Sequence, residues 1–211
     1  DYCCGGKQAF DEACLAKGLS PEGVLAEVEQ AQVAAAPDRD WQSAPLGDLV
    51  NHIVSTHHEL LKRELPVLSQ RMEKVKGVHG HHEPEMWNGA AEIFAALREE
   101  MEMHMQKEEE ILFPYIGQYG RAESLGEPMP RVPFGTIARP IHMMEMEHES
   151  AGGALVKIRA LTRDYELPEY ACSTVRALFD GLKMVEADLH VHIHLENNIL
   201  FPRAVALETR R

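Results

Sequence analysis

The sequence predicts an all-α protein: an antiparallel four-helix bundle preceded by a small helical N-terminal domain. The composition favours helix over sheet, because only 6% of the residues are aromatic while Ala, Leu, Met and Glu are common. Four long segments carry apolar residues at alternating spacings of three and four, the periodicity of a bundle seam. A motif near the end of the second segment recurs near the end of the fourth, which indicates two similar units packed together.

Size and charge limit the functional classes. The 211 residues, 45% of them apolar, are enough for one bundle-sized domain with a small appendage. The net charge of −13 repels phosphate groups and argues against a nucleic acid partner. No apolar run approaches the roughly 18–20 residues that span a bilayer, so we expect no membrane partner.

The cysteine content bears on the compartment. Four cysteines in a chain of this length do not resemble the dense disulfide framework of small secreted proteins, and no signal peptide is visible. The sequence therefore predicts a cytoplasmic protein. The chain begins at Asp1 rather than at a methionine, from which we expect a further segment upstream.

The N-terminal segment is predicted to be a separate, short helical unit. Cys3 and Cys4 precede a Gly-Gly pair, and helical patterns follow at about 8–17 and 21–35. The segment is too short to bury a core of its own. The predicted units are an N-terminal domain truncated at its start over 1–36, a linker over 37–44 and the bundle over 45–211.

Four helical patterns make up the predicted bundle. Pro66 is expected to bend or interrupt the first of them. The stretch 117–135 is rich in Gly and Pro, and we expect it to be a connection longer than usual between helices. The turn that carries His79, His81 and His82 is expected to be a solvated loop. The predicted helices cover about 45–76, 84–115, 136–163 and 168–207.

The repeated motif pairs a histidine with a glutamate four residues later. His104-x-x-x-Glu108 is followed by Ile-Leu-Phe-Pro, and His192-x-x-x-Glu196 is followed by the same four residues, 88 positions further on. Residues four apart lie on one face of a helix, one turn from each other. An imidazole and a carboxylate so placed can reach one metal ion, or two adjacent ions.

Each of the four apolar stripes contains a histidine where a leucine would otherwise stand, at His57, His104, His148 and His192. Buried glutamates are costly unless they are paired or bound to metal. For a single histidine, a hydrogen-bonded core residue is the better interpretation. Four at matching positions, two of them in a repeated motif with glutamate, favour a metal site instead.

Distances along the helices test this interpretation. His57 lies about 18 residues before the first turn and His104 about 20 after it, or roughly 27 Å and 30 Å at the α-helical rise. The third and fourth helices match less well, so the fourth must start later than Pro168, tilt, or follow a longer turn. His58, beside His57 at the edge of the stripe, is interpreted as a hydrogen-bond partner behind the ligands.

The predicted site is a pair of metal ions bridged by two carboxylates. Imidazole and carboxylate ligands favour iron, zinc or manganese over calcium. Two histidines for each ion and two shared glutamates leave coordination positions open for an oxo or hydroxo bridge and a small ligand. The predicted ligands are His57, His104, Glu108, His148, His192 and Glu196.

These residues resemble the seam of the hemerythrin-like four-helix bundle. The start Asp-Tyr-Cys-Cys-Gly-Gly-Lys resembles the short N-terminal domain of the repair-of-iron-centres family. The resemblance implies a non-haem di-iron centre held by the same six residues and bridged by Glu108 and Glu196. It also implies a cytoplasmic role in repairing iron–sulfur clusters after nitrosative or oxidative stress, with damaged cluster proteins or cluster scaffolds as partners. A homodimer is left open.

The resemblance favours iron donation and leaves alternatives. Oxygen-carrying hemerythrins use five histidines and two carboxylates, whereas Glu196 stands here in place of a further histidine, which argues against oxygen carriage. An enzyme that reduces nitric oxide or peroxide at the same site, and a sensor that binds nitric oxide or oxygen, are the alternatives. Cys3 and Cys4 are candidates for iron transfer, nitrosylation or a vicinal disulfide, or are inert thiols; Cys14 and Cys172 are interpreted as packing residues.

Overall fold

We describe the fold from a computed structural model, which covers residues 9–34 and 39–209. The described residues are helical, without a strand, which confirms the predicted all-α class. Near the N-terminus, α1 (Phe10–Ala16) and α2 (Pro21–Ala34) pack against each other. The predicted boundary between an N-terminal domain and a linker remains a prediction, and Cys3 and Cys4 lie outside the described residues.

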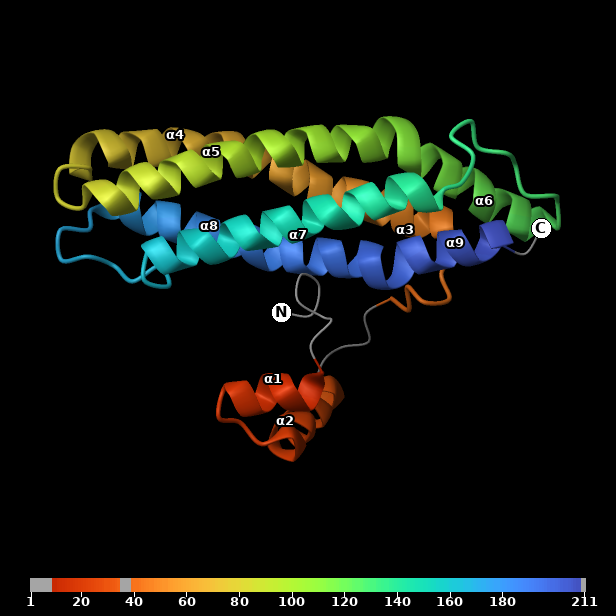
Figure 1. The fold of residues 1–211 in the computed structure, drawn as a ribbon, viewed down its shortest axis with the longest axis horizontal. Helices are drawn as coiled ribbons and strands as arrows, with labels where there is room; N and C mark the ends of the chain where they lie inside the picture. Colours follow the sequence, from red (N-terminus) through yellow and green to blue (C-terminus); the bar gives the residue numbers. More distant parts are fainter. Residues whose placement is uncertain (1–8, 35–38, 210–211) are drawn as a thin grey trace.

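Four long helical columns lie side by side in Figure 1 and form the bundle. Three of the columns are interrupted by one π-helical turn each, where hydrogen bonds run from residue i to i+5. The first column consists of α3 (Leu46–His52), η1 (Ile53–His58) and α4 (Glu59–His79). The second consists of α5 (Pro84–Lys107), η2 (Glu108–Leu112) and α6 (Phe113–Leu125). The third is α7 (Ala138–Leu161), and the fourth is α8 (Ser173–Leu195), η3 (Glu196–Leu200) and α9 (Phe201–Thr209).

The hydrophobic core is divided into two clusters along the bundle. One cluster joins α4, α5, α7 and α8 through residues such as Leu61, Met101 and Leu189. The other joins α3, α6, α9 and the start of α7 through residues such as Leu49 and Ile116. The polar residues of the predicted seam lie between these two clusters along each column. The core therefore encloses that seam with apolar side chains on both sides.

Three boundaries differ from the sequence expectations or refine them. Pro66 lies inside α4 without interrupting it. The predicted connection over 117–135 was wrong in its first half, because α6 continues to Leu125 and ends at Gly126, whose φ of 65° is left-handed. Gly120 lies within α6, at a point where that helix approaches α3 closely. A Cβ atom there would stand 3.0 Å from the Cβ of Leu46, so the position favours glycine. The fourth column starts at Ser173, five residues later than the predicted start at about 168, and a later start was one of the three alternatives for the mismatch between the third and fourth helices.

Candidate metal centre

Six side chains from the four columns meet between the two hydrophobic clusters. They form two overlapping groups. Within each group, the ligand atoms all lie within 4.8 Å of one another. Both groups contain Glu108 and Glu196, and every member is at most 1% exposed. The first group adds His58 and His192; the second adds His104 and His148.

The Nε2 atoms of the four histidines converge. His58 Nε2 and His192 Nε2 are 3.1 Å apart, and His104 Nε2 and His148 Nε2 are 3.0 Å apart. Glu196 lies between the pairs, with Oε1 at 3.0 Å from His192 Nε2 and Oε2 at 3.2 Å from His148 Nε2. Each oxygen of this carboxylate therefore faces a different histidine pair, which is the arrangement of a bridging ligand.

The second carboxylate is shared in another way. Glu108 Oε2 lies 3.3 Å from His104 Nε2 and 3.4 Å from His58 Nε2, so a single oxygen faces both pairs. Both oxygens of Glu108 and Oε2 of Glu196 are buried and lack a hydrogen bond among the described residues. Buried carboxylate oxygens without donors are costly. Metal ions between the histidine pairs would satisfy them, so the residues present fit a two-metal centre.

Hydrogen bonds behind the site orient three of the four histidines. The Nδ1–H groups of His58 and His104 donate to Glu109 at 2.7 Å and to Glu147 at 2.8 Å, since a carboxylate can only accept. The Nδ1 of His148 lies 2.9 Å from the side-chain oxygen of Asn197. A donating Nδ1–H leaves the Nε2 lone pair free for a metal. All three rings are thus held in the tautomer that a ligand needs.

The structure places His58, not His57, at the position predicted for the first ligand. His57 is buried but belongs to neither group; its Nδ1 is 2.9 Å from Oδ1 of Asp188. The reason is the π-helical turn η1, which places residue i+5 rather than i+4 above Ile53. The sequence argument assumed an unbroken α-helix and therefore chose the neighbouring histidine. The other five predicted ligands come together in the two groups.

The histidines and carboxylates of the site shift one another's pKa values. Burial alone would lower the pKa of His104, but the negative charge of Glu108 and the hydrogen bond to Glu147 outweigh burial and raise it to about 10. The hydrogen bond from His104 in turn lowers the pKa of Glu147 to about 2, against its partial burial. Burial acts to raise the pKa of Glu196, yet the adjacent His192 and His148 hold it well below its usual value. The shared carboxylates therefore remain ionised, as metal binding requires.

Cys172 differs from the interpretation as a packing residue. It is exposed, it occupies the N-cap position of α8, and its sulfur lies 3.3 Å from His79 Nε2. Two hydrogen bonds lower the pKa of this thiol to about 6: the one from the backbone N–H of Val175 has the larger effect, and the one with the His79 ring the smaller. Cys14, in contrast, is buried as expected. A cysteine that begins a helix, with a histidine opposite, is visible in a sequence only once the start of the helix is known.

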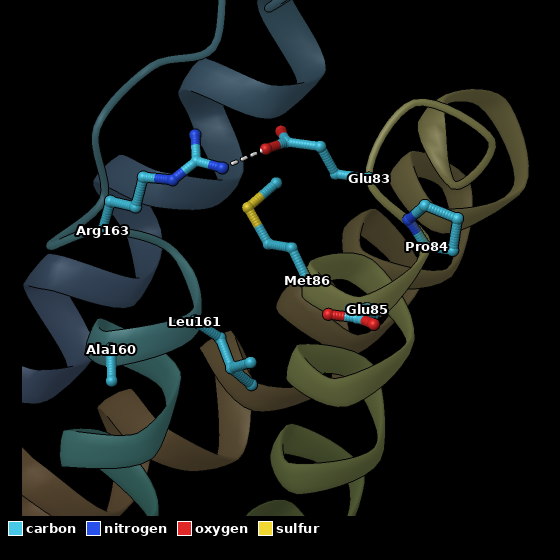
Figure 2. A pocket seen from close by; sticks show the side chains of 7 residues that line it. All are labelled: Glu83, Pro84, Glu85, Met86, Ala160, Leu161 and Arg163. Atoms are coloured by element: carbon cyan, nitrogen blue, oxygen red, sulfur yellow. Dashed lines mark hydrogen bonds and ion pairs between the residues drawn. The ribbon is translucent and has the colours of Figure 1, made fainter.

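A surface pocket of about 570 Å³ lies at the opposite end of α5 from His104. Figure 2 shows its walls at the start of α5 and the end of α7, with an ion pair between Arg163 and Glu83 on one side. His104 lies 20 positions after Pro84, or roughly 30 Å along the helix. The pocket is therefore separate from the metal centre. None of the described helices is long and apolar enough to cross a membrane.

Fold and site together define a four-helix bundle with a candidate two-metal centre in its seam. The hemerythrin HHE cation binding domain matches residues 49–204.

The iron-sulfur cluster repair protein YtfE of Citrobacter koseri is 39% identical over 209 residues, which cover 99% of this chain and 88% of that protein. The protein of the same name from Pectobacterium carotovorum is 40% identical over 205 residues, covering 97% and 86%. That of an Escherichia coli strain is 39% identical over 209 residues, covering 99% and 88%. The chain therefore belongs to the hemerythrin HHE cation-binding family, together with these YtfE proteins.

Substitution of the two adjacent histidines separates the alternatives for the first ligand. We expect His58→Ala to lower the metal content from two ions per chain to one or fewer, because His58 faces both shared carboxylates and His57 does not. His57→Ala is the matched control and should retain both ions. Metal analysis of the purified, reconstituted variants gives the answer. Loss of metal in the His57 variant but not in the His58 variant would show that His57 is the ligand, as the sequence predicted.

The pH dependence of alkylation tests the environment of Cys172. The thiolate is the nucleophile, so the rate of modification by iodoacetamide should fall as the pH drops through about 6, the pKa of this thiol. An ordinary thiol would lose reactivity near about 8.5. Peptide mass spectrometry follows Cys172 separately from the buried Cys14. His79→Asn should move the midpoint upward, and a wild-type midpoint at or above 8 would refute this picture.

Proposed function

We propose that this chain is a cytoplasmic di-iron protein that helps to repair iron–sulfur clusters damaged by nitrosative or oxidative stress, by donating iron. The observation that carries the proposal is the pair of overlapping groups that share Glu108 and Glu196. Relatives at 39–40% identity are named iron-sulfur cluster repair proteins, which supplies the class of target. Damaged cluster proteins or cluster scaffolds are the proposed acceptors.

The donor set supports iron. Imidazole and carboxylate together suit iron, zinc or manganese, and the shared carboxylates offset the repulsion between two nearby cations. When bound, iron supplies open coordination positions and a change of oxidation state. His58 and His192 would hold one ion and His104 and His148 the other, with Glu108 and Glu196 bridging both.

The same arrangement suits release. Each position has two imidazoles of its own, whereas both carboxylates are shared, so one ion can leave without removing the histidines of the other. A hollow of about 290 Å³ lies at the surface beside Glu109, the hydrogen-bond partner of His58. Glu102, Glu110 and Lys62 also line it, so the carboxylates outnumber the one lysine, which pairs with Glu109. Carboxylates there attract a departing cation toward the surface.

A second candidate is the reduction of nitric oxide or peroxide at the same centre. Apolar clusters enclose the site on both sides, and this suits a small uncharged molecule such as nitric oxide or oxygen. Reversible binding by a sensor would use the same enclosure. The three functions differ in what happens to the iron: it leaves the donor, whereas the enzyme and the sensor retain it.

The experiment follows iron-57 from the reconstituted full chain to a cluster-free acceptor protein behind a filtration step. We expect iron-57 to reach the acceptor and restore its cluster when a sulfide source is present. Glu196→Ala should lose its iron before mixing and therefore transfer none, because the bridge is gone. Glu73→Gln, an exposed carboxylate on α4 that lies fifteen positions after His58, or roughly 22 Å along the helix, is the control and should transfer normally.

Two outcomes would contradict donation. In the first, iron-57 stays with the chain while nitric oxide is consumed with an electron donor, which identifies an enzyme. In the second, nitric oxide or oxygen binds reversibly without turnover and without loss of iron, which identifies a sensor or carrier.

A further inference from the structure

The four histidines of the metal centre are not equivalent. His58, His104 and His148 each have a hydrogen-bond partner at Nδ1. The Nδ1 of His192 is buried and has no such partner among residues 9–34 and 39–209. At the metal position formed by His104 and His148, both rings therefore have a hydrogen-bond partner at Nδ1. At the position formed by His58 and His192, only His58 has one.

Asp188 is the residue that would complete the set. It lies four residues before His192 on α8, one turn earlier on the same face, toward which helical side chains lean. Its Oδ1 is 2.9 Å from His57 Nδ1, while its Oδ2 is buried and has no partner in the described chain. One oxygen of Asp188 is thus used by His57, and neither is used by His192.

His57 itself lies against His192. The two rings are parallel within 2°, with centroids 5.5 Å apart, and His57 Nε2 is buried without a partner in the part of the chain that is described. His57, Asp188 and His192 are therefore neighbours, and the carboxylate bonds to the histidine that does not face the metal groups. The π-helical turn η1 accounts for the pairing of His57 with Asp188, since it directs His58 to the site and leaves His57 beside it.

We propose that the two metal positions differ in affinity, that the one held by His58 and His192 is the labile one, and that His57 makes it so by holding Asp188 away from His192. The inference rests on the proposed function and identifies which iron is donated. A carboxylate behind a ligand histidine fixes its tautomer and raises its basicity, and its loss lowers metal affinity about 10–100-fold.

The exposure of the carboxylates behind the ligand histidines does not explain the difference. Glu109 and Glu147, the carboxylates behind His58 and His104, have side chains exposed to 27% and 29%. A lysine pairs with each, Lys62 with Glu109 and Lys107 with Glu147. The two sides of the centre match in these respects and differ at His192. A donor of this kind would release one iron while the better supported position keeps the other.

The test measures iron release from the reconstituted ferrous full chain to a coloured ferrous chelator. We expect two phases in the wild type, each with about half of the iron. His57→Phe keeps the stacked ring and frees Asp188 to accept from His192 Nδ1, and should slow the fast phase about 10–100-fold. The double variant His57→Phe/Asp188→Ala should return to the fast rate, because the gain depends on the carboxylate. Asp188→Ala alone should leave the fast phase nearly unchanged.

A spectroscopic measurement separates positioning from a loss of structure. The Mössbauer spectrum of iron-57 protein stopped after the fast phase should show a single uncoupled iron in wild type and the original coupled pair in His57→Phe. Circular dichroism of the metal-free variants checks folding, and His57→Leu replaces the Phe variant if the latter does not fold. Release in a single phase from the wild type, or a fast phase unchanged in the folded variant, overturns the inference. Because the chelator needs no protein acceptor, failed transfer to a cluster protein leaves this result unaffected.

Discussion

The structure depends on the burial of two carboxylates side by side. Glu108 and Glu196 are fully buried, and each lies 3.0–3.4 Å from two imidazoles, Glu108 from His58 and His104 and Glu196 from His148 and His192. Two buried like charges are unfavourable unless cations compensate them. Part of this compensation comes from His104, whose pKa is raised to about 10. The surrounding features follow from this constraint: convergent Nε2 atoms, outward hydrogen bonds, and apolar clusters that keep water away.

The π-helical turns are the backbone's contribution to the centre. Two of them begin at the shared glutamates, and the third ends at His58. Each adds a residue to its turn and changes which side chains face the seam on either side of it. The apolar stripe can thus continue through the helix while a polar pair occupies the interior. The third column, α7, contributes His148 and is an unbroken α-helix.

The sequence predicted which residues face the seam wherever a column keeps the unbroken α-helical repeat of 3.6 residues per turn. The repeated histidine-glutamate motif predicted four of the residues that the structure brings together, and the stripe of the third helix predicted His148, because each lies in phase with its own apolar neighbours. The sequence argument chose His57, whereas the structure brings His58 into the two groups, because α-helical phase holds only up to the π-helical turn and the hydrogen bonding within that turn is not visible in residue types. Gly120 was assigned to a loop since its close approach to Leu46 depends on tertiary packing. Cys172 was misjudged for the related reason that the start of α8 was placed too early.

The central claim is that the six seam residues hold two iron ions in one coupled centre. The most direct measurement is a Mössbauer spectrum of the chain reconstituted with iron-57, with a metal count on the same sample. We predict two irons per chain, spin-coupled and with nitrogen and oxygen ligands, as expected for the two groups that share Glu108 and Glu196. A single uncoupled iron, no bound iron, or zinc retained in its place would contradict the account.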